Sequence, residues 1–252
     1  MAPRGKAVLR RVMIGTRVLI GREKELRLLD DLMRQKRNVL ILGEEGVGKS
    51  VIVENALASG VVKNILYSKR STTLKETLVN MVGAAVGSKD LPQKNILSLK
   101  KLCYQLLDKN PEYVVLDQVA WVERKFYAFL TYLKERKIPF IIATRRPGKK
   151  NLGHLWMGLY DFETLELKNL DQAKAGQLID HYASSLDLKN EAATFFKKEL
   201  FNVSKGNPKI IRELCRLAQE EKYRSKGYVD VKLMDLDRRI ESAIGRLGNQ
   251  AF

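Results

Sequence analysis

The chain has 252 residues, of which 45% are hydrophobic, so it can bury a full core as one large domain or two modest ones. Its 46 lysines and arginines outnumber its 29 acidic residues, which gives a net charge of +17. An excess of this size favours a polyanionic partner, because neutralising phosphates releases counterions. A solvated, lysine-rich surface is the alternative. No apolar run approaches the roughly 20 residues of a membrane span, which argues against a membrane protein.

Residues 1–17 are predicted to form a basic arm. The arm has no acidic residue and carries Arg4, Lys6, Arg10, Arg11 and Arg17. The arginines interrupt its apolar stretch, which makes it a poor secretion signal. Cys103 and Cys215 each lie in a helical apolar pattern, so we expect buried thiols in a reducing interior rather than a disulfide or a metal site. These features predict a cytoplasmic protein.

Helical and strand-like segments then alternate as far as residue 167. A helical pattern at Leu26, Leu29 and Met33 comes first, and strand-like runs follow at 38–42, 62–67, 112–116, 138–143 and 162–167, with further helical patterns between them. Strands that alternate with helices predict an α/β fold with a parallel five-stranded sheet covered by helices on both faces.

The first strand leads into a phosphate-binding motif. Residues 43–50 fit G-x-x-x-x-G-K-[ST], and the assigned nucleotide-contacting residues are Gly43, Glu44, Glu45, Gly46, Val47, Gly48, Lys49, Ser50 and Val51. The following segment reads as a helix, whose N-terminus adds partial positive charge to the backbone N–H groups of the loop. A glycine-rich turn that matches by chance is the alternative. The strand–loop–helix context favours nucleotide binding, with Lys49 on the β- and γ-phosphates and Ser50 on Mg²⁺.

Two later strands end in polar residues. The strand at 112–116 is followed by Asp117, a Walker B pattern in which the carboxylate holds Mg²⁺ through its water shell. One strand separates the two motifs in sequence, which suits nucleotidases that place an additional strand between the two motif strands in the sheet. The strand at 138–143 is followed by Thr144, Arg145 and Arg146. A polar residue at this strand tip can reach the γ-phosphate or the attacking water; a plain strand-end turn is the alternative.

The chain after Leu167 predicts a second, all-helical domain. We expect helices from Asp171 to about Ser184, over 190–202 and over 208–222, and a fourth with an apolar stripe at Leu233, Leu236, Ile240, Ile244 and Leu247. The stripe is expected to pack on its own domain, and a partner-binding face is the alternative. The predicted domains are therefore the arm, a nucleotide-binding domain at 18–169 and a helical lid at 170–252.

Three further segments resemble AAA+ and STAND-type P-loop ATPases, in particular the archaeal ATPase and replication-initiator groups. Residues 19–26, Leu-Ile-Gly-Arg-Glu-Lys-Glu-Leu, are similar to the box that opens these domains and lies near the adenine, which implies that Gly21 and Arg22 contact the nucleotide. Residues 165–173 resemble the passage into the helical lid. Residues 206–209, Gly-Asn-Pro-Lys, resemble the lid motif that carries sensor 2 and implicate Pro208 and Lys209.

The resemblance implies roles and two departures. Lys49 and Ser50 take the phosphate and metal roles, Asp117 the Walker B role, Thr144 the sensor 1 role, and Lys209 the sensor 2 position, with Arg212 one turn on. The family usually has arginine at sensor 2, and lysine lacks its planar fork.

Gln118 occupies the position of the catalytic glutamate. Glutamine can orient a water but cannot take its proton, so we expect slow hydrolysis or a base from elsewhere, such as Glu123. Arg145 and Arg146 are candidates for the arginine finger.

The basic residues are dispersed, which suits contact with a phosphate backbone better than base readout. They cluster in the arm, at Lys94, Lys100 and Lys101, at Arg145, Arg146, Lys149 and Lys150, at Lys197 and Lys198, and at Lys222, Arg224 and Lys226. Tyr223 and Tyr228 can stack on bases or pack against the lid.

We therefore expect an ATP- and Mg²⁺-binding AAA+ ATPase, oligomeric with itself or with a partner ATPase, that acts as a switch on DNA or a DNA-bound partner. A STAND-type or chaperone-like ATPase that acts on a protein partner is the alternative.

Overall fold

The structure is a computed structural model that describes residues 17–87, 90–186, 188, 190–225 and 228–248. The predicted basic arm, except Arg17, and Lys226 lie outside the described residues. The chain divides into an α/β unit that ends at Leu167 and a helical unit from Lys168, with the loop residues Gly46–Gly48 grouped with the second. None of the helices within the described ranges is long and apolar enough to cross a bilayer.

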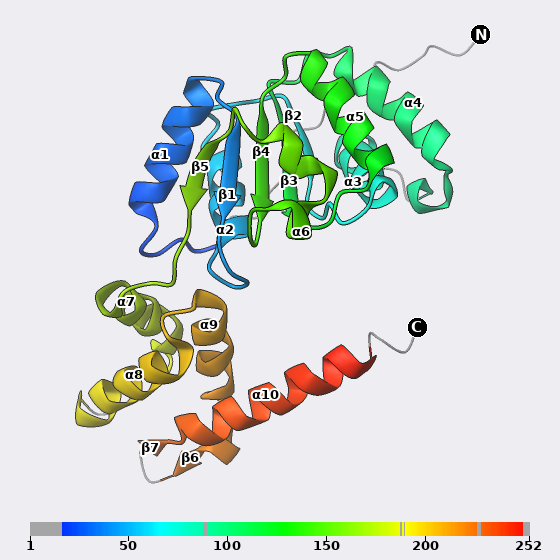
Figure 1. Cartoon of the computed structure of the whole chain (residues 1–252). Coiled ribbons are helices and arrows are strands. Elements are labelled where there is room, and N and C mark those ends of the chain that lie inside the picture. The colour runs from blue at the N-terminus through cyan, green and yellow to red at the C-terminus, as the bar shows by residue number, and fades with distance from the viewer. Residues whose placement is uncertain (1–16, 88–89, 187, 189, 226–227, 249–252) are drawn as a thin grey trace. The chain divides into compact units, whose positions relative to one another are not determined.

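The α/β unit follows the predicted alternation. Its elements are α1 (Glu23–Arg34), β1 (Val39–Leu42), α2 (Lys49–Ala58), β2 (Ile65–Ser68), α3 (Leu74–Val86), η1 (Leu91–Gln93), α4 (Ile96–Leu107), β3 (Tyr113–Val119), α5 (Arg124–Glu135), β4 (Phe140–Thr144), α6 (Lys149–Leu152), η2 (His154–Gly158) and β5 (Glu163–Glu166). All five strands are parallel and lie in the order β2-β3-β4-β1-β5 (Figure 1). The expected additional strand is β4, which separates β1 from β3.

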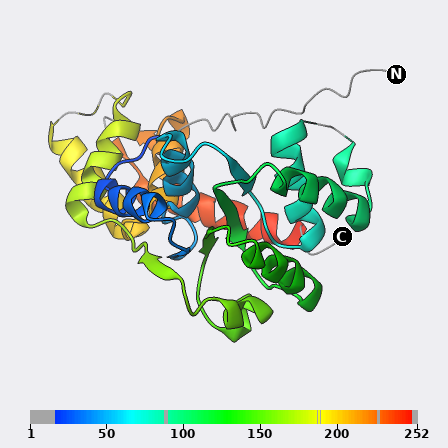
Figure 2. The ribbon, with the colours of Figure 1, turned by 90° about the horizontal axis from the view of Figure 1, so that it is seen from above.

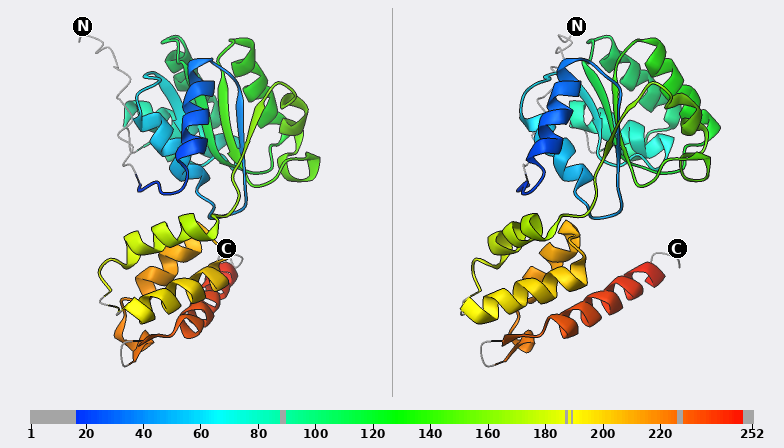
Figure 3. Two further views of the ribbon diagram at one scale, coloured as in Figure 1. Left: turned by 90° about the vertical axis from the view of Figure 1, so that its left-hand side faces the viewer. Right: turned by 60° about the vertical axis from the view of Figure 1, so that its left-hand side comes forward.

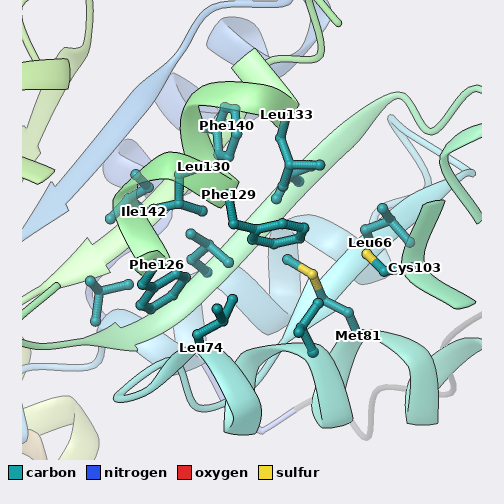
Figure 4. Close-up of a cluster of buried hydrophobic side chains, with 14 of the residues drawn as sticks. Leu66, Leu74, Met81, Cys103, Phe126, Phe129, Leu130, Leu133, Phe140 and Ile142 are labelled. Atoms are coloured by element: carbon teal, nitrogen blue, oxygen red, sulfur yellow. The ribbon is translucent and has the colours of Figure 1, made fainter. Parts of the chain in front are cut away.

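Alternating side chains of the strands face two helical layers. Leu66, Phe140 and Ile142 pack with residues of α3, α4 and α5, including Met81, Cys103 and Phe129 (Figure 4). The intervening residues belong to the other face, where Tyr113 donates a hydrogen bond to the carbonyl of Arg37, just after α1 (2.9 Å). Figure 2 shows the two layers on opposite sides of the strands. The predicted doubly covered sheet is confirmed.

Both cysteines are buried free thiols, as expected. Burial raises the pKa of Cys103 and of Cys215 to about 12 in each case. Neither thiol is therefore a reactive thiolate near neutral pH.

In its described residues, the helical unit contains four long helices and one short antiparallel strand pair. Its elements are α7 (Gln172–Ala183), α8 (Asn190–Ser204), α9 (Pro208–Leu217), η3 (Glu221–Tyr223), β6 (Arg224–Ser225), β7 (Tyr228–Val229) and α10 (Val231–Gly248). Asp171 caps α7 by accepting a hydrogen bond from the backbone N–H of Lys174 (2.9 Å), as its position predicted.

The expected packing of the apolar stripe on α10 is wrong. Four of its members are exposed: Leu233 (40%), Leu236 (54%), Ile240 (48%) and Ile244 (64%). The helix instead packs through Val231, Met234 and Asp235, which are buried. In the first turns of α10, Leu233 and Leu236 therefore lie on a different face from the one that is buried. The later turns extend past α8 and α9 (Figure 3), which leaves Ile240 and Ile244 exposed.

Candidate functional site

The carboxyl ends of β1, β3 and β4 bring the predicted catalytic residues to one edge of the sheet. Leu42, the last residue of β1, is in register with Thr144, and Leu116 of β3 is in register with Ile142 of β4. The phosphate loop therefore follows β1, Arg145 follows β4, and Asp117 lies near the carboxyl end of β3. This edge is where open α/β sheets place their ligands.

Two glycines shape the phosphate loop, and the side chain of Lys49 hydrogen-bonds to the loop backbone. Gly46 (φ 84°) and Gly48 (φ 104°) adopt conformations that favour glycine. The Lys49 ammonium donates hydrogen bonds to the carbonyls of Gly43 (2.6 Å) and Glu44 (2.8 Å). Burial lowers the pKa of Lys49, and the nearby Asp117 partly offsets this effect. The ammonium thus lies inside the loop at the start of α2, where an anion is stabilised by both the charge and the helix dipole.

Two arginines neutralise the acidic residues of the loop. Arg145 pairs with Glu45, and Arg146 pairs with Glu44 (2.7 Å). All four side chains are at least half exposed, so each pair alone contributes little stability. Their chemical effect is on the loop: two carboxylates beside a phosphate site would repel a nucleotide, and the arginines cancel that charge.

We expect Arg145→Ala together with Arg146→Ala to weaken nucleotide binding about tenfold at low salt, because the loop acids lose their counter-charges. The variant that also carries Glu44→Gln and Glu45→Gln should regain affinity. Titration with a fluorescent ATP analogue at two salt concentrations measures both effects. If the quadruple variant binds the nucleotide no more tightly than the arginine double variant, the arginines contact the nucleotide directly instead.

Asp117 has the features of a metal-binding carboxylate. Its side chain is fully buried, and Oδ1 accepts a hydrogen bond from the backbone N–H of Gln118 (2.7 Å). Oδ2 is buried and has no hydrogen-bond partner within the described part of the chain. Burial raises the pKa of Asp117, while Ser50, the Gln118 N–H and Lys49 partly offset it. A buried, orphaned carboxylate oxygen next to Ser50 fits a hard divalent cation such as Mg²⁺.

Gln118 and Thr144 lie where β3 departs from regular geometry. Gln118 has φ 53°, in the left-handed region, and an exposed side chain; the register of β3 against β4 shifts between Leu116 and Val119. The hydroxyl of buried Thr144 donates to the carbonyl of Val119 (2.9 Å). That hydroxyl therefore holds the irregular end of β3 in this structure, a role that the strand-tip pattern did not predict.

A second buried carboxylate, Glu54, was not identified from the sequence. It lies one helical turn after Ser50 on α2, is 5% exposed and pairs with Arg17 (2.9 Å). The buried hydroxyl of Tyr67 lies near both Glu54 and Asp117. Burial raises the pKa of Tyr67, and the negative charges of Asp117 and Glu54 raise it further. An acidic residue one turn after the motif serine, within an otherwise apolar helix, is the signal that could have revealed this cluster.

Removing Arg17 is expected to destabilise the α/β unit. Arg17→Ala leaves the carboxylate of Glu54 buried without its cation, which should cost about 2 kcal/mol and lower Tm by about 6 °C. Arg34→Ala is the matched control, because its pair with Asp31 is 60% exposed on both sides and should contribute less than about 0.5 kcal/mol. Adding Glu54→Gln should restore Tm. Thermal melts monitored by circular dichroism give the Tm of each variant. Equal Tm values for Arg17→Ala and Arg34→Ala would contradict this prediction.

The other predicted residues lie at the starts of helices. Gly21 (φ 73°) donates its N–H to Glu23 (2.9 Å), and buried Arg22 pairs with Glu25 (2.9 Å) at the start of α1. Pro208 and Lys209 begin α9 of the helical unit, whose cap is Asn207, which accepts from the N–H of Lys209 (3.0 Å).

The structure also places Glu123, the alternative base, and the two tyrosines that were candidates for stacking on bases. Glu123 is the N-cap residue of α5 and is exposed. Tyr223 is buried and donates a hydrogen bond to Asp237 (2.7 Å), so it packs within the helical unit and does not present a free stacking face. Tyr228 is 45% exposed beside Phe195.

Comparison with solved structures identifies the fold. No family model and no curated protein sequence matches the chain. A Walker-type ATPase of Pyrococcus abyssi is similar in structure, with TM-score 0.59 and 17% identity over 92% of this chain and 74% of that one. Two RuvB variants of Thermotoga maritima each align with TM-score 0.53 and 16% identity over 87% of this chain and 69% of theirs. The chain thus has the fold of AAA+ and Walker-type P-loop ATPases.

Proposed function

We propose that this chain, which has the fold of AAA+ P-loop ATPases, binds Mg²⁺–ATP at the carboxyl edge of its sheet and hydrolyses it slowly. The observation that carries the proposal is the orphaned Oδ2 of buried Asp117, next to the loop that contains Lys49. A buried carboxylate oxygen that lacks a hydrogen-bond partner costs free energy unless a cation completes its coordination. ATP brings such a cation.

The residues of the chain divide the work of binding. Lys49, whose ammonium now bonds to two loop carbonyls, transfers those hydrogen bonds to the β- and γ-phosphates. Ser50 and Asp117 hold Mg²⁺, which supplies positive charge at the phosphates when bound. Arg145 and Arg146 keep the loop acids neutralised. Gln118 orients water by hydrogen bonding but takes no proton from it, which is the basis for slow turnover.

The proposed role is that of an ATP-controlled switch on DNA or on a DNA-bound partner in the cytoplasm, assembled with itself or with a partner ATPase. The net charge of +17 supports a polyanionic partner. A protein-directed, STAND-like role is the alternative, and the exposed aliphatic stripe of α10 is the observation that favours it.

ATP binding is tested with Lys49→Ala, which should weaken affinity about 100-fold because a buried, charge-assisted contact to the phosphates is lost. Lys63→Ala removes an exposed lysine outside the loop and is the control. Calorimetric titration with and without Mg²⁺ is the measurement. Equal affinity of Lys49→Ala and unmodified protein would overturn nucleotide binding at this loop.

The switch is tested by titrating duplex DNA with and without ATP at two salt concentrations, with a mass measurement of the complexes. ATP-dependent binding that weakens steeply with salt supports the proposal. No DNA binding at low salt would overturn it and favour a protein partner.

A further inference from the structure

The only two tryptophans of the chain, Trp121 and Trp156, are both exposed on the α/β unit. Trp121 is 56% exposed and Trp156 is 46% exposed, and Met157 beside the latter is 59% exposed. Large aromatic side chains are ordinarily among the most deeply buried on average. Two exposed tryptophans on neighbouring segments therefore indicate a surface that contacts another molecule.

Backbone contacts hold the two tryptophan-bearing segments together. The N–H of Val122 donates to the carbonyl of Leu152 (3.3 Å), and the N–H of His154 donates to the carbonyl of Val122 (3.0 Å). Gly153 (φ 57°) lies between these bonds, and a Cβ there would be 3.1 Å from the ring of Trp121 and 2.6 Å from the carbonyl of Val122. Glycine thus allows the ring of Trp121 to lie directly against the α6–η2 segment, so it is fixed although exposed.

The same segments are strongly basic. Residues 145–160 contain four basic residues and no acidic one, and Lys149 and Lys150 on α6 are exposed. Arg124 and Lys125 follow Trp121 at the start of α5 and are exposed too, with Glu123 as the single acid of that turn. We call Trp121, Arg124, Lys149, Lys150, Trp156 and Met157 the tryptophan surface; Figure 1 shows the positions of α5 and α6.

We propose that the tryptophan surface binds single-stranded DNA, a refinement that rests on the proposed action on DNA. Tryptophan rings stack on unpaired bases, and the flanking lysines and Arg124 contact the phosphates. The bases of a duplex are already stacked on one another, so two exposed aromatic faces favour a single strand. Protein interfaces are depleted in lysine, so the charge of this surface matches a polyanion better than an apolar protein face.

The surface is also directly connected to the nucleotide site. Trp121 lies four residues after Asp117 in the chain and two residues beyond the end of β3 at Val119. Arg145 and Arg146, which pair with the acids of the phosphate loop, belong to the same basic segment as Lys149 and Lys150. A strand bound here lies next to both elements of the ATP site.

The test uses the tryptophans as their own reporters, because the chain has no others. The full chain is titrated with an oligo(dT) of about 20 nucleotides while tryptophan emission is recorded, and anisotropy of a labelled oligonucleotide gives affinity in parallel. Quenching that saturates with binding is expected. Trp121→Ala and Trp156→Ala should each weaken binding about tenfold, and the two phenylalanine replacements should retain most of the affinity.

Lysine variants test the phosphate contacts. Lys149→Ala with Lys150→Ala should reduce the slope of log affinity against log salt by about 1.4, since each phosphate contact on a single strand contributes about 0.7. The control is Lys63→Ala with Lys75→Ala, which removes the same charge from exposed positions before β2 and on α3. This control should leave the slope unchanged.

Each remaining outcome has a defined meaning. DNA binding without quenching and unaffected by the tryptophan variants overturns the tryptophan surface but leaves the proposed DNA role intact. Tighter binding of duplex, or equal binding of oligo(rU), overturns the choice of single-stranded DNA. Absence of binding to single-stranded and duplex DNA alike at low salt overturns the inference and the proposed DNA role together.

Discussion

Gln118→Glu is expected to raise the rate of ATP hydrolysis about 100-fold. A positioned general base accelerates such a step by a factor of about 10² to 10⁴, and glutamine cannot accept the proton of the attacking water. Gln118 is the exposed residue directly after the buried Asp117, at the irregular end of β3. The new carboxylate would therefore stand next to Asp117, the proposed Mg²⁺ ligand, at the edge of the sheet where ATP is proposed to bind.

Phosphate release under saturating Mg²⁺–ATP measures this effect, with Gln118→Gly as the control. Glycine adopts the left-handed conformation of residue 118 (φ 53°) without strain, so this control should stabilise the fold by about 1 kcal/mol without any gain in turnover. Brisk hydrolysis by the unmodified protein, or a Gln118→Glu variant no faster than it, would contradict the assignment.

Asp117→Asn is expected to lower Mg²⁺-dependent hydrolysis about 1000-fold and to raise the Tm of the nucleotide-free protein. The amide loses the charge that binds Mg²⁺ but keeps an oxygen that accepts from the Gln118 N–H. Because burial raises the pKa of Asp117 in the folded state, the ionised carboxylate destabilises that state at neutral pH. Removing the charge should therefore raise the free energy of unfolding, in the direction that the pKa shift gives.

The pH dependence has a definite sign. A raised carboxyl pKa means that the folded state binds more protons than the unfolded state. Without Mg²⁺, the destabilisation caused by ionised Asp117 therefore decreases as the pH falls from neutral through the raised pKa of Asp117. In thermal melts, the gain in Tm of Asp117→Asn over the unmodified protein should therefore be largest at neutral pH and should shrink as the pH is lowered. Glu135→Gln, which removes an exposed acid of α5 that has no assigned role, should change neither Tm nor turnover. A destabilised Asp117→Asn variant at pH 7 would contradict the argument.

Much of the α/β unit follows from local patterns in the sequence. Short apolar runs between helical patterns predicted each strand, and the glycine spacing of residues 43–50 predicted the phosphate loop. The Asp171 cap also needs only its immediate neighbours, since its carboxylate bonds to an N–H three residues on. The strand bounds differ in places. The strands predicted at 62–67 and 138–143 begin later, at Ile65 and Phe140. β3 continues past Leu116 to Val119, because the bulge at Gln118 and the bond from Thr144 maintain its pairing with β4.

The sequence by itself determined the order of the elements and the residues that follow the strands at 112–116 and 138–143, because hydrophobic periodicity and glycine spacing act over a few neighbouring residues. Only the tertiary structure decided what those residues contact. The pairing of Arg17 with Glu54, the exposed stripe of α10 and the backbone bonds between Val122 and residues 152–154 could not be read from local patterns. Burial and charge pairing between such segments are set by how the elements pack, which no local pattern specifies.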